Sequence, residues 1–159
     1  MKKWFILLLL TSVGLASCSS TKTVVKTTKR GATKIDKIIS NALKYKGVPY
    51  TFGGTTKRGM DCSGLVYVSF LQEKIPIPRV SRDMAKKGKK VSLKNAKKGD
   101  LLFFKTSKKR NRINHVGLII SVKKNQIRFI HATTSRGVIT SLLSDKYWKN
   151  AFVKVKRIL

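Results

Sequence analysis

Apolar residues recur at helical spacing along one segment near residue 35. Thr33 begins this predicted helix, and its apolar positions are Ile35, Ile38, Ile39, Ala42 and Leu43. Thr33 and Asp36 resemble a capping box in which Asp replaces the usual Glu. Gly47 and Pro49 follow, and we expect them to end the helix.

A second helix is predicted from Cys62 to about Glu73, after a loop with three glycines, VPYTFGGTTKRGM. Its residues are apolar or small nearly all round, which is typical of a buried helix. Asp61 stands at the N-cap position, where a carboxylate accepts hydrogen bonds from the first amides. Two prolines then break the chain, and we expect Ser81 to cap a short helix that ends at Gly88.

The second half of the chain predicts β-strands over 101–105, 116–122, 126–132 and 151–158. Lys123, Lys124 and Asn125 are expected to join the middle two strands as a hairpin. Helices followed by antiparallel strands predict an α+β fold.

The N-terminus combines a short basic start, an apolar run and small residues, which is typical of a secretory signal. The apolar run is too short for a confident transmembrane span, which needs about 20 residues. Residues 15–18, LASC, resemble the bacterial lipobox, in which the cysteine is lipidated and becomes the mature N-terminus. The alternative is a plain signal peptide with an incidental Cys18. We therefore expect a signal peptide over 1–17, a lipidated N-terminus and flexible tether over 18–32, and one domain over 33–159.

The chain is strongly basic, with 36 Lys and Arg residues against 6 Asp and Glu and a formal net charge of +30. Such a charge favours polyanions, including anionic lipids and cell-wall polymers. The basic residues are spread along the sequence, and no nucleic-acid-binding motif is present. We interpret the charge as a solubilising surface with weak nonspecific attraction, and expect no specific nucleic-acid partner.

The chain has two cysteines, Cys18 and Cys62. If Cys18 is lipidated, Cys62 has no intramolecular partner, although exported domains usually place cysteines in disulfides. Cys62 then forms an intermolecular bond, or is a reactive thiol, or is a buried, inert residue. Its place in the first turn of a helix favours an anion, because the helix dipole and free amides stabilise a thiolate. Thiols so placed have pKa values lowered to about 3.5–7.5 when a cation is near.

Both histidines of the chain, His115 and His131, lie on the predicted hairpin. A turn centred on Lys124 places them diagonally on one face of the sheet, whereas a slip of one residue places them on opposite faces. With Cys62 they supply a nucleophile, a base and a group that orients the base. Structural roles for each histidine remain open, and so does a zinc site, although the three residues lack the short paired spacing of structural zinc sites.

Six motifs resemble the NlpC family of bacterial cell-wall cysteine peptidases, which have a papain-like fold. The resemblance runs from about residue 35 to residue 155, and the motifs occur in family order: GVPYTFGG, DCSGLV, PRVS, GDLLFF, HVG and IHA. It implies an NlpC-type domain with N-terminal helices packed on an antiparallel sheet. It also implies that Cys62 cleaves peptidoglycan stem peptides, with His115 as base and His131 as the third residue.

The resemblance also implies residues that stabilise the oxyanion and bind the substrate. Tyr50 matches the family tyrosine near the nucleophile, and its hydroxyl could help to hold the oxyanion; a core tyrosine is the alternative. Asp61 and Ser63 flank the nucleophile and could bind polar groups of the substrate, although Asp61 could equally be only the helix cap. Arg79 and Ser81 could contact a stem-peptide carboxylate, or could be solvated loop residues.

The resemblance implies an endopeptidase that acts on the bond from γ-D-glutamyl to the diamino acid, or on D,D cross-links. Because Cys62 lies at a helix start and both histidines lie on the hairpin, we expect a thiol mechanism without metal, and we expect no cofactor. An N-acetylmuramoyl amidase, an acyltransferase and a non-catalytic wall-binding lipoprotein remain alternatives. We expect a monomer, held in the cell envelope by its lipid. Ser19 favours the outer membrane, facing the periplasm, if the cell has two membranes.

Overall fold

A computed structural model describes residues 31–107, 111–124 and 126–159. The predicted signal peptide, Cys18 and nearly all of the predicted tether lie outside these residues, so they stay predictions. Within the described ranges, no helix is both long enough and apolar enough to cross a membrane.

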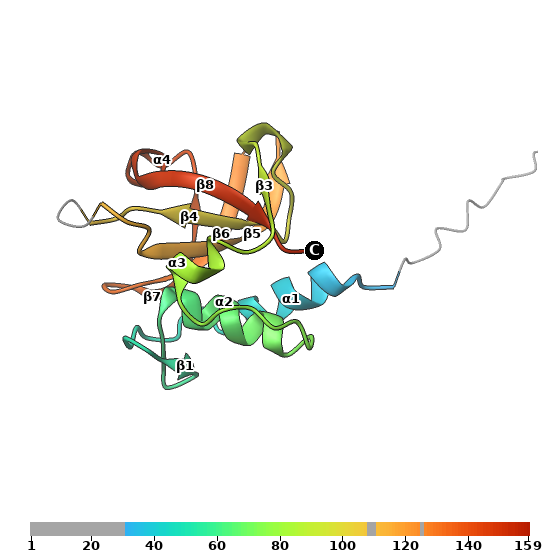
Figure 1. Cartoon of the computed structure of the whole chain (residues 1–159). Coiled ribbons are helices and arrows are strands. Elements are labelled where there is room, and N and C mark those ends of the chain that lie inside the picture. Colours follow the sequence, from blue (N-terminus) through green and yellow to red (C-terminus); the bar gives the residue numbers. More distant parts are fainter. Residues whose placement is uncertain (1–30, 108–110, 125) are drawn as a thin grey trace, which may run out of the picture.

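The chain folds as helices on an antiparallel sheet, which confirms the predicted α+β class (Figure 1). The helices are α1 (Lys34–Leu43), α2 (Cys62–Leu71), α3 (Ser81–Met84) and α4 (Lys146–Ala151), with a 3-10 turn, η1 (Leu93–Asn95). A small hairpin joins β1 (Thr55–Thr56) to β2 (Gly59–Met60). The main sheet contains, in spatial order, β3 (Lys89–Val91), β8 (Phe152–Arg157), β4 (Leu101–Phe104), β5 (His115–Lys123), β6 (Gln126–Thr133) and β7 (Gly137–Leu142).

Alternate residues of the sheet strands enter two separate cores. In Figure 1, α1 and α2 lie against one face of the main sheet, and α4 lies on the opposite side. The helix-side core joins strand residues such as Val116 and Ile130 to Leu65 and Phe70 of α2. The other core joins the remaining strand positions to Trp148 of α4. The sheet therefore has both faces covered, with α2 on one and α4 on the other.

The local signals at the two long helices are confirmed. The Thr33 side chain accepts from the Asp36 amide at 3.2 Å, and the Asp36 carboxylate accepts from the Thr33 amide at 3.1 Å, which completes the capping box. Asp61 caps α2 by accepting from the Gly64 amide at 2.6 Å. The helix that follows the prolines differs from its prediction. Ser81 is its first residue and Val80 is the N-cap, without a side-chain cap, and α3 ends at Met84.

The β5–β6 hairpin places both histidines on one face of the sheet, as predicted, but its strands pair in a different register near the turn. Near the turn, Val122 pairs with Ile127, which is offset by one residue from a turn centred on Lys124. A β-bulge between Ile119 and Ser121 then shifts the register back, so that Leu118 pairs with Ile130. A bulge inserts one unpaired residue and thereby reverses the facing of all residues beyond it. Without this bulge, the two histidines would lie on opposite faces of the sheet.

Several elements were missing from the sequence prediction, namely β1, β2, β3, β7, η1 and α4. Most are short, with two to six residues each, and β3 pairs with β8, which is distant in the sequence. Strand β7 is the consequential omission, because it lies beside β6 and contacts the histidine pair described below.

Candidate active site

The Cys62 thiol lies at the first residue of α2 and is almost fully buried. Burial raises its pKa to about 11, against the lowering effect of the nearby amides of Val116 and Ser63, and the charge of Asp61 adds to the rise. The position of the thiol at a helix start predicts a lowered pKa. That expectation is wrong for the free protein, because desolvation outweighs the helix amides. Cys62 is therefore a neutral thiol at rest, and it needs a base to become a nucleophile.

The Asp61 carboxylate organises the backbone immediately before the thiol. Besides capping α2, it accepts from the Gly53 amide at 2.8 Å and from both terminal nitrogens of Arg79, at 2.9 and 2.8 Å. The Ser63 hydroxyl donates to Asp61 at 3.1 Å and accepts from Arg79 at 2.9 Å. Burial raises the pKa of Asp61, but the hydrogen bonds from Arg79, Gly64 and Gly53 outweigh it, and the net shift is downward. The helix-cap role of Asp61 is thus present in the structure.

The guanidinium of Arg79 forms hydrogen bonds with groups of the protein itself. It pairs with Asp61 in the bidentate manner that the sequence predicts toward a substrate carboxylate, and it also donates to the Gly54 carbonyl at 3.2 Å. A Cβ on Gly64 would collide with that same carbonyl oxygen and would lie 3.0 Å from Arg79. The glycine of the DCSG motif therefore lets the α2 start approach the Gly54 loop. A substrate-binding role for Arg79 stays a prediction.

The two histidines form a hydrogen-bonded pair. Nε2 of His115 and Nδ1 of His131 are 3.0 Å apart, and Nε2 of His131 lies 3.0 Å from the Ser141 hydroxyl of β7. Since Nε2 of His115 is occupied, Nδ1 is its remaining nitrogen for proton transfer with the thiol. The predicted juxtaposition of the histidines is present, and a third residue, Ser141, extends it.

Aromatic rings enclose the imidazoles. Trp148 stacks on His115 with centroids 5.2 Å apart, and it meets His131 edge-on at 4.5 Å. Phe129 lies 4.6 Å from His131. Burial lowers the pKa of His115 to about 4, partly offset by the charge of Asp61. Burial, then the charges of His115 and Arg136, lower the pKa of His131 to about 2. Both imidazoles are therefore neutral at rest, so that His115 is available as a base.

Cys62 and Tyr50 line two adjoining hollows. One, of about 450 Å³, also contains His115, Trp148 and Arg136 of the β6–β7 turn. The other, of about 560 Å³, is lined in addition by Asp61, Ser63, Arg79, Ser81, Phe52 and Arg112. Since Cys62 and Tyr50 belong to both, they lie where the hollows meet, and an extended chain could pass the thiol on either side. Burial raises the pKa of Tyr50, which keeps its hydroxyl protonated as a donor.

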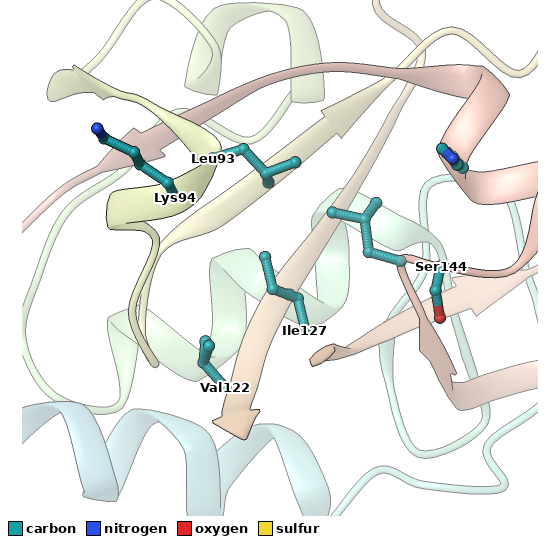
Figure 2. A pocket seen from close by; sticks show the side chains of 7 residues that line it. Leu93, Lys94, Val122, Ile127 and Ser144 are labelled. Carbon is teal, nitrogen blue, oxygen red and sulfur yellow. The ribbon is translucent and has the colours of Figure 1, made fainter. Parts of the chain in front are cut away.

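A third hollow lies away from this cleft, on the α4 side of the sheet (Figure 2). Its lining combines apolar residues, including Leu93, Val122 and Ile127, with Lys94 and Lys149. None of the predicted site residues borders it, so it is separate from the thiol chemistry.

The structure brings together all the predicted site residues within the described ranges. It adds Ser141, Trp148 and Arg136, which the sequence analysis missed. The β-branched run before Ser141 was a usable strand signal, whereas nothing local marks Trp148. Across the described segments, no group of three or more His, Cys, Asp and Glu side chains could hold a metal ion, so the zinc alternative finds no ligand cluster there.

The chain is similar in sequence to several known proteins. "Probable endopeptidase NlpC" of Escherichia coli is 34% identical over 157 residues, covering 97% of this chain and 99% of that protein. "Murein DD-endopeptidase MepS/Murein LD-carboxypeptidase" of the same species is 38% identical over 124 residues, covering 77% and 62%. "Gamma-DL-glutamyl hydrolase" of Bacillus subtilis is 39% identical over 122 residues, covering 76% and 28%.

A solved structure shows the same fold. The crystal structure of a Staphylococcus aureus protein, described as similar to a lipoprotein of the NLP/P60 family, matches with a TM-score of 0.69 and 32% identity, covering 79% of this chain and 41% of that one. The family model that matches residues 47–157 is described as "NlpC/P60 family". This confirms the predicted resemblance and the NlpC-type, papain-like domain: the chain belongs to the NlpC/P60 family.

Proposed function

We propose that the protein is a cell-envelope peptidoglycan endopeptidase that hydrolyses an amide bond of stem peptides through Cys62. The observation that carries this proposal is the meeting of Cys62 and His115 in one hollow, with the second nitrogen of His115 held by His131. A thiol and an oriented imidazole are the nucleophile and base of acyl transfer. The name of one relative, a murein endopeptidase, supports peptidoglycan as the substrate, and the name of another supports endopeptidase activity.

The reaction begins with both partners neutral. Nδ1 of His115 takes the thiol proton while the sulfur of Cys62 attacks the amide carbon. The Cys62 backbone N–H and the Tyr50 hydroxyl donate to the oxyanion. His115, now an imidazolium, gives its proton to the leaving amine, and the acyl group remains on sulfur as a thioester. Water, deprotonated by His115, then releases the acid and restores the thiol.

The bond from γ-D-glutamyl to the diamino acid is our first choice. The name of the Bacillus subtilis hydrolase supports a γ-glutamyl bond, whereas the name of the second Escherichia coli relative supports a D,D cross-link. Asp61, Ser63, Arg79 and Ser81 line the hollow on one side of Cys62 and are proposed to bind the stem peptide there. Because Arg79 is paired with Asp61, these two residues also fix the shape of that hollow.

The proposed location follows from the N-terminal sequence. A lipid on Cys18 and the tether would hold the domain in the cell envelope, close to the wall. In a cell with two membranes, the proposed site is the outer membrane, facing the periplasm.

The test is digestion of purified peptidoglycan followed by mass spectrometry of the soluble fragments. The wild type should create new amino termini on the diamino acid, and Cys62→Ala should create none. Separated cross-links with intact stems would favour the D,D bond, and cleavage next to N-acetylmuramic acid would favour an amidase. Inactivation by EDTA that zinc reverses would revive the metal alternative. Binding without cleavage by the wild type would show a non-catalytic wall-binding protein.

A further inference from the structure

The His115–His131 pair continues into a third buried polar group. His131 is completely buried on β6, and its Nε2 lies 3.0 Å from the hydroxyl of Ser141, which is itself buried on β7. Strand pairing accounts for this proximity. Phe129 pairs with Ser141 and Ile139 with His131, so the two polar side chains lie diagonally on one face of the sheet. His131 therefore has a hydrogen-bond partner at each ring nitrogen, and both partners are side chains.

Two arrangements of protons satisfy this chain of groups. In the first, Nε2–H of His115 donates to Nδ1 of His131, and Nε2–H of His131 donates to Ser141. In the second, Ser141 donates to His131, and Nδ1–H of His131 donates to Nε2 of His115. A neutral imidazole carries one proton, so the second arrangement places the proton of His115 on Nδ1. Only the first leaves Nδ1 of His115 free to take a proton from the thiol.

The charged state of His115 also requires the first arrangement, in which Nδ1 of His131 is unprotonated. As an imidazolium, His115 carries N–H groups at both nitrogens, so Nδ1 of His131 must accept. His131 then carries its proton on Nε2 and requires an acceptor there. No acceptor other than the Ser141 hydroxyl is hydrogen-bonded to this nitrogen within the described residues. The neutral hydroxyl also leaves His131 uncharged, in keeping with its strongly lowered pKa.

We propose that Ser141 is a positioning residue of the active site: by accepting the Nε2 proton of His131, it holds His131 in the tautomer that keeps His115 competent as a base. Replacing Ser141 by Ala leaves a buried N–H without a partner in that tautomer. The unprotonated Nε2 of the opposite tautomer then becomes the better state, because an unpaired buried donor is strongly unfavourable. The catalytic consequence rests on the proposed function, whereas the tautomer is a property of the free protein.

The experiment uses the full chain, labelled with ¹⁵N-histidine and purified with a tag that contains no histidine. The chain has only two histidines, so four ring nitrogens are observed by NMR. In the wild type, Nε2 should be protonated and Nδ1 unprotonated on both rings. Ser141→Ala should move the His131 proton to Nδ1, and Ser141→Thr, which keeps the hydroxyl, should retain the wild-type pattern. Ser69→Ala is the matched control, since Ser69 is a buried serine that donates to the Leu65 carbonyl, on α2.

Activity gives the second readout. Ser141→Ala should lower kcat about 10- to 100-fold with KM nearly unchanged, whereas Ser141→Thr should recover most of the loss and Ser69→Ala should retain wild-type kcat. A protonated Nδ1 on His131 of the wild type overturns the proposal, and so does a Ser141→Ala protein with unchanged tautomers. If Ser141→Ala does not fold, the wild-type and Ser141→Thr spectra still decide. If the wild type shows the expected tautomers but does not cleave peptidoglycan, the proposed function is refuted and the role of Ser141 in setting the tautomer stands.

Discussion

Removing the Asp61 carboxylate should destabilise the domain far more than removing an exposed one. Asp61→Ala deletes the α2 cap, worth about 1 kcal/mol. It also leaves the guanidinium of Arg79 without its bidentate partner. Breaking a buried pair costs about 3–5 kcal/mol, and the lower end applies because the Arg79 side chain is 31% exposed. The free energy of unfolding should therefore fall by roughly 3–4 kcal/mol, a drop in Tm of roughly 10 °C for a domain of this size.

Asp83 supplies the matched control. Its carboxylate pairs with Lys86 at 3.0 Å, but both side chains are exposed. Asp83→Ala should reduce stability by no more than about 1 kcal/mol. The assay is urea unfolding at neutral pH, followed by circular dichroism, with thermal melts as a second measure. If Asp61→Ala loses no more stability than Asp83→Ala, the Asp61–Arg79 pair does not support the fold as we describe.

The pH dependence gives an independent check on the same carboxylate. Folding lowers the pKa of Asp61, so its stabilisation is present above the unfolded pKa of about 3.9 and is lost as the pH falls through the folded value. Asp61→Asn keeps a side-chain oxygen for the cap but has no charge to titrate. The stability gap between the wild type and Asp61→Asn should be constant from about pH 5 to 7 and should narrow below about pH 4. A gap that widens on acidification would contradict the assigned sign.

Three other predictions concern the thiol, a motif glycine and the N-terminus. Because burial raises the pKa of Cys62 to about 11, its alkylation by iodoacetamide in the folded protein should accelerate about tenfold per pH unit up to pH 9; a plateau below pH 7 would show a preformed thiolate–imidazolium pair. Gly64→Ala should lower the free energy of unfolding by about 1–3 kcal/mol in chemical denaturation, since the new Cβ collides with the Gly54 carbonyl; a stabilised variant would mean that helix propensity outweighs this contact. Cys18→Ala should release the protein from the membrane fraction and abolish labelling by a fatty-acid probe, and persistent labelling would exclude Cys18 as the lipidated residue.

The sequence by itself determined the features that depend on neighbouring residues. The capping box of α1 needs only Thr33 and Asp36, and the cap of α2 needs only Asp61 ahead of a helical run. These contacts close within one turn, so the local pattern is sufficient to predict them. The motifs around Cys62, His115 and His131 likewise identified the family, the thiol and imidazole that share one hollow, and the second histidine that pairs with the first.

Features that depend on distant contacts were decided by the tertiary structure. The β-bulge between Ile119 and Ser121 sets which face the histidines share, and no residue near the turn signals it. Packing against both sheet faces buries Cys62 and His115, and this desolvation reverses the pKa expected for a thiol at a helix start. Ser141 reaches His131 through the register in which β7 pairs with β6, which the strand signal before Ser141 does not specify. In each case the deciding contact joins segments whose proximity is set by the folded sheet, so local periodicity and spacing do not contain it.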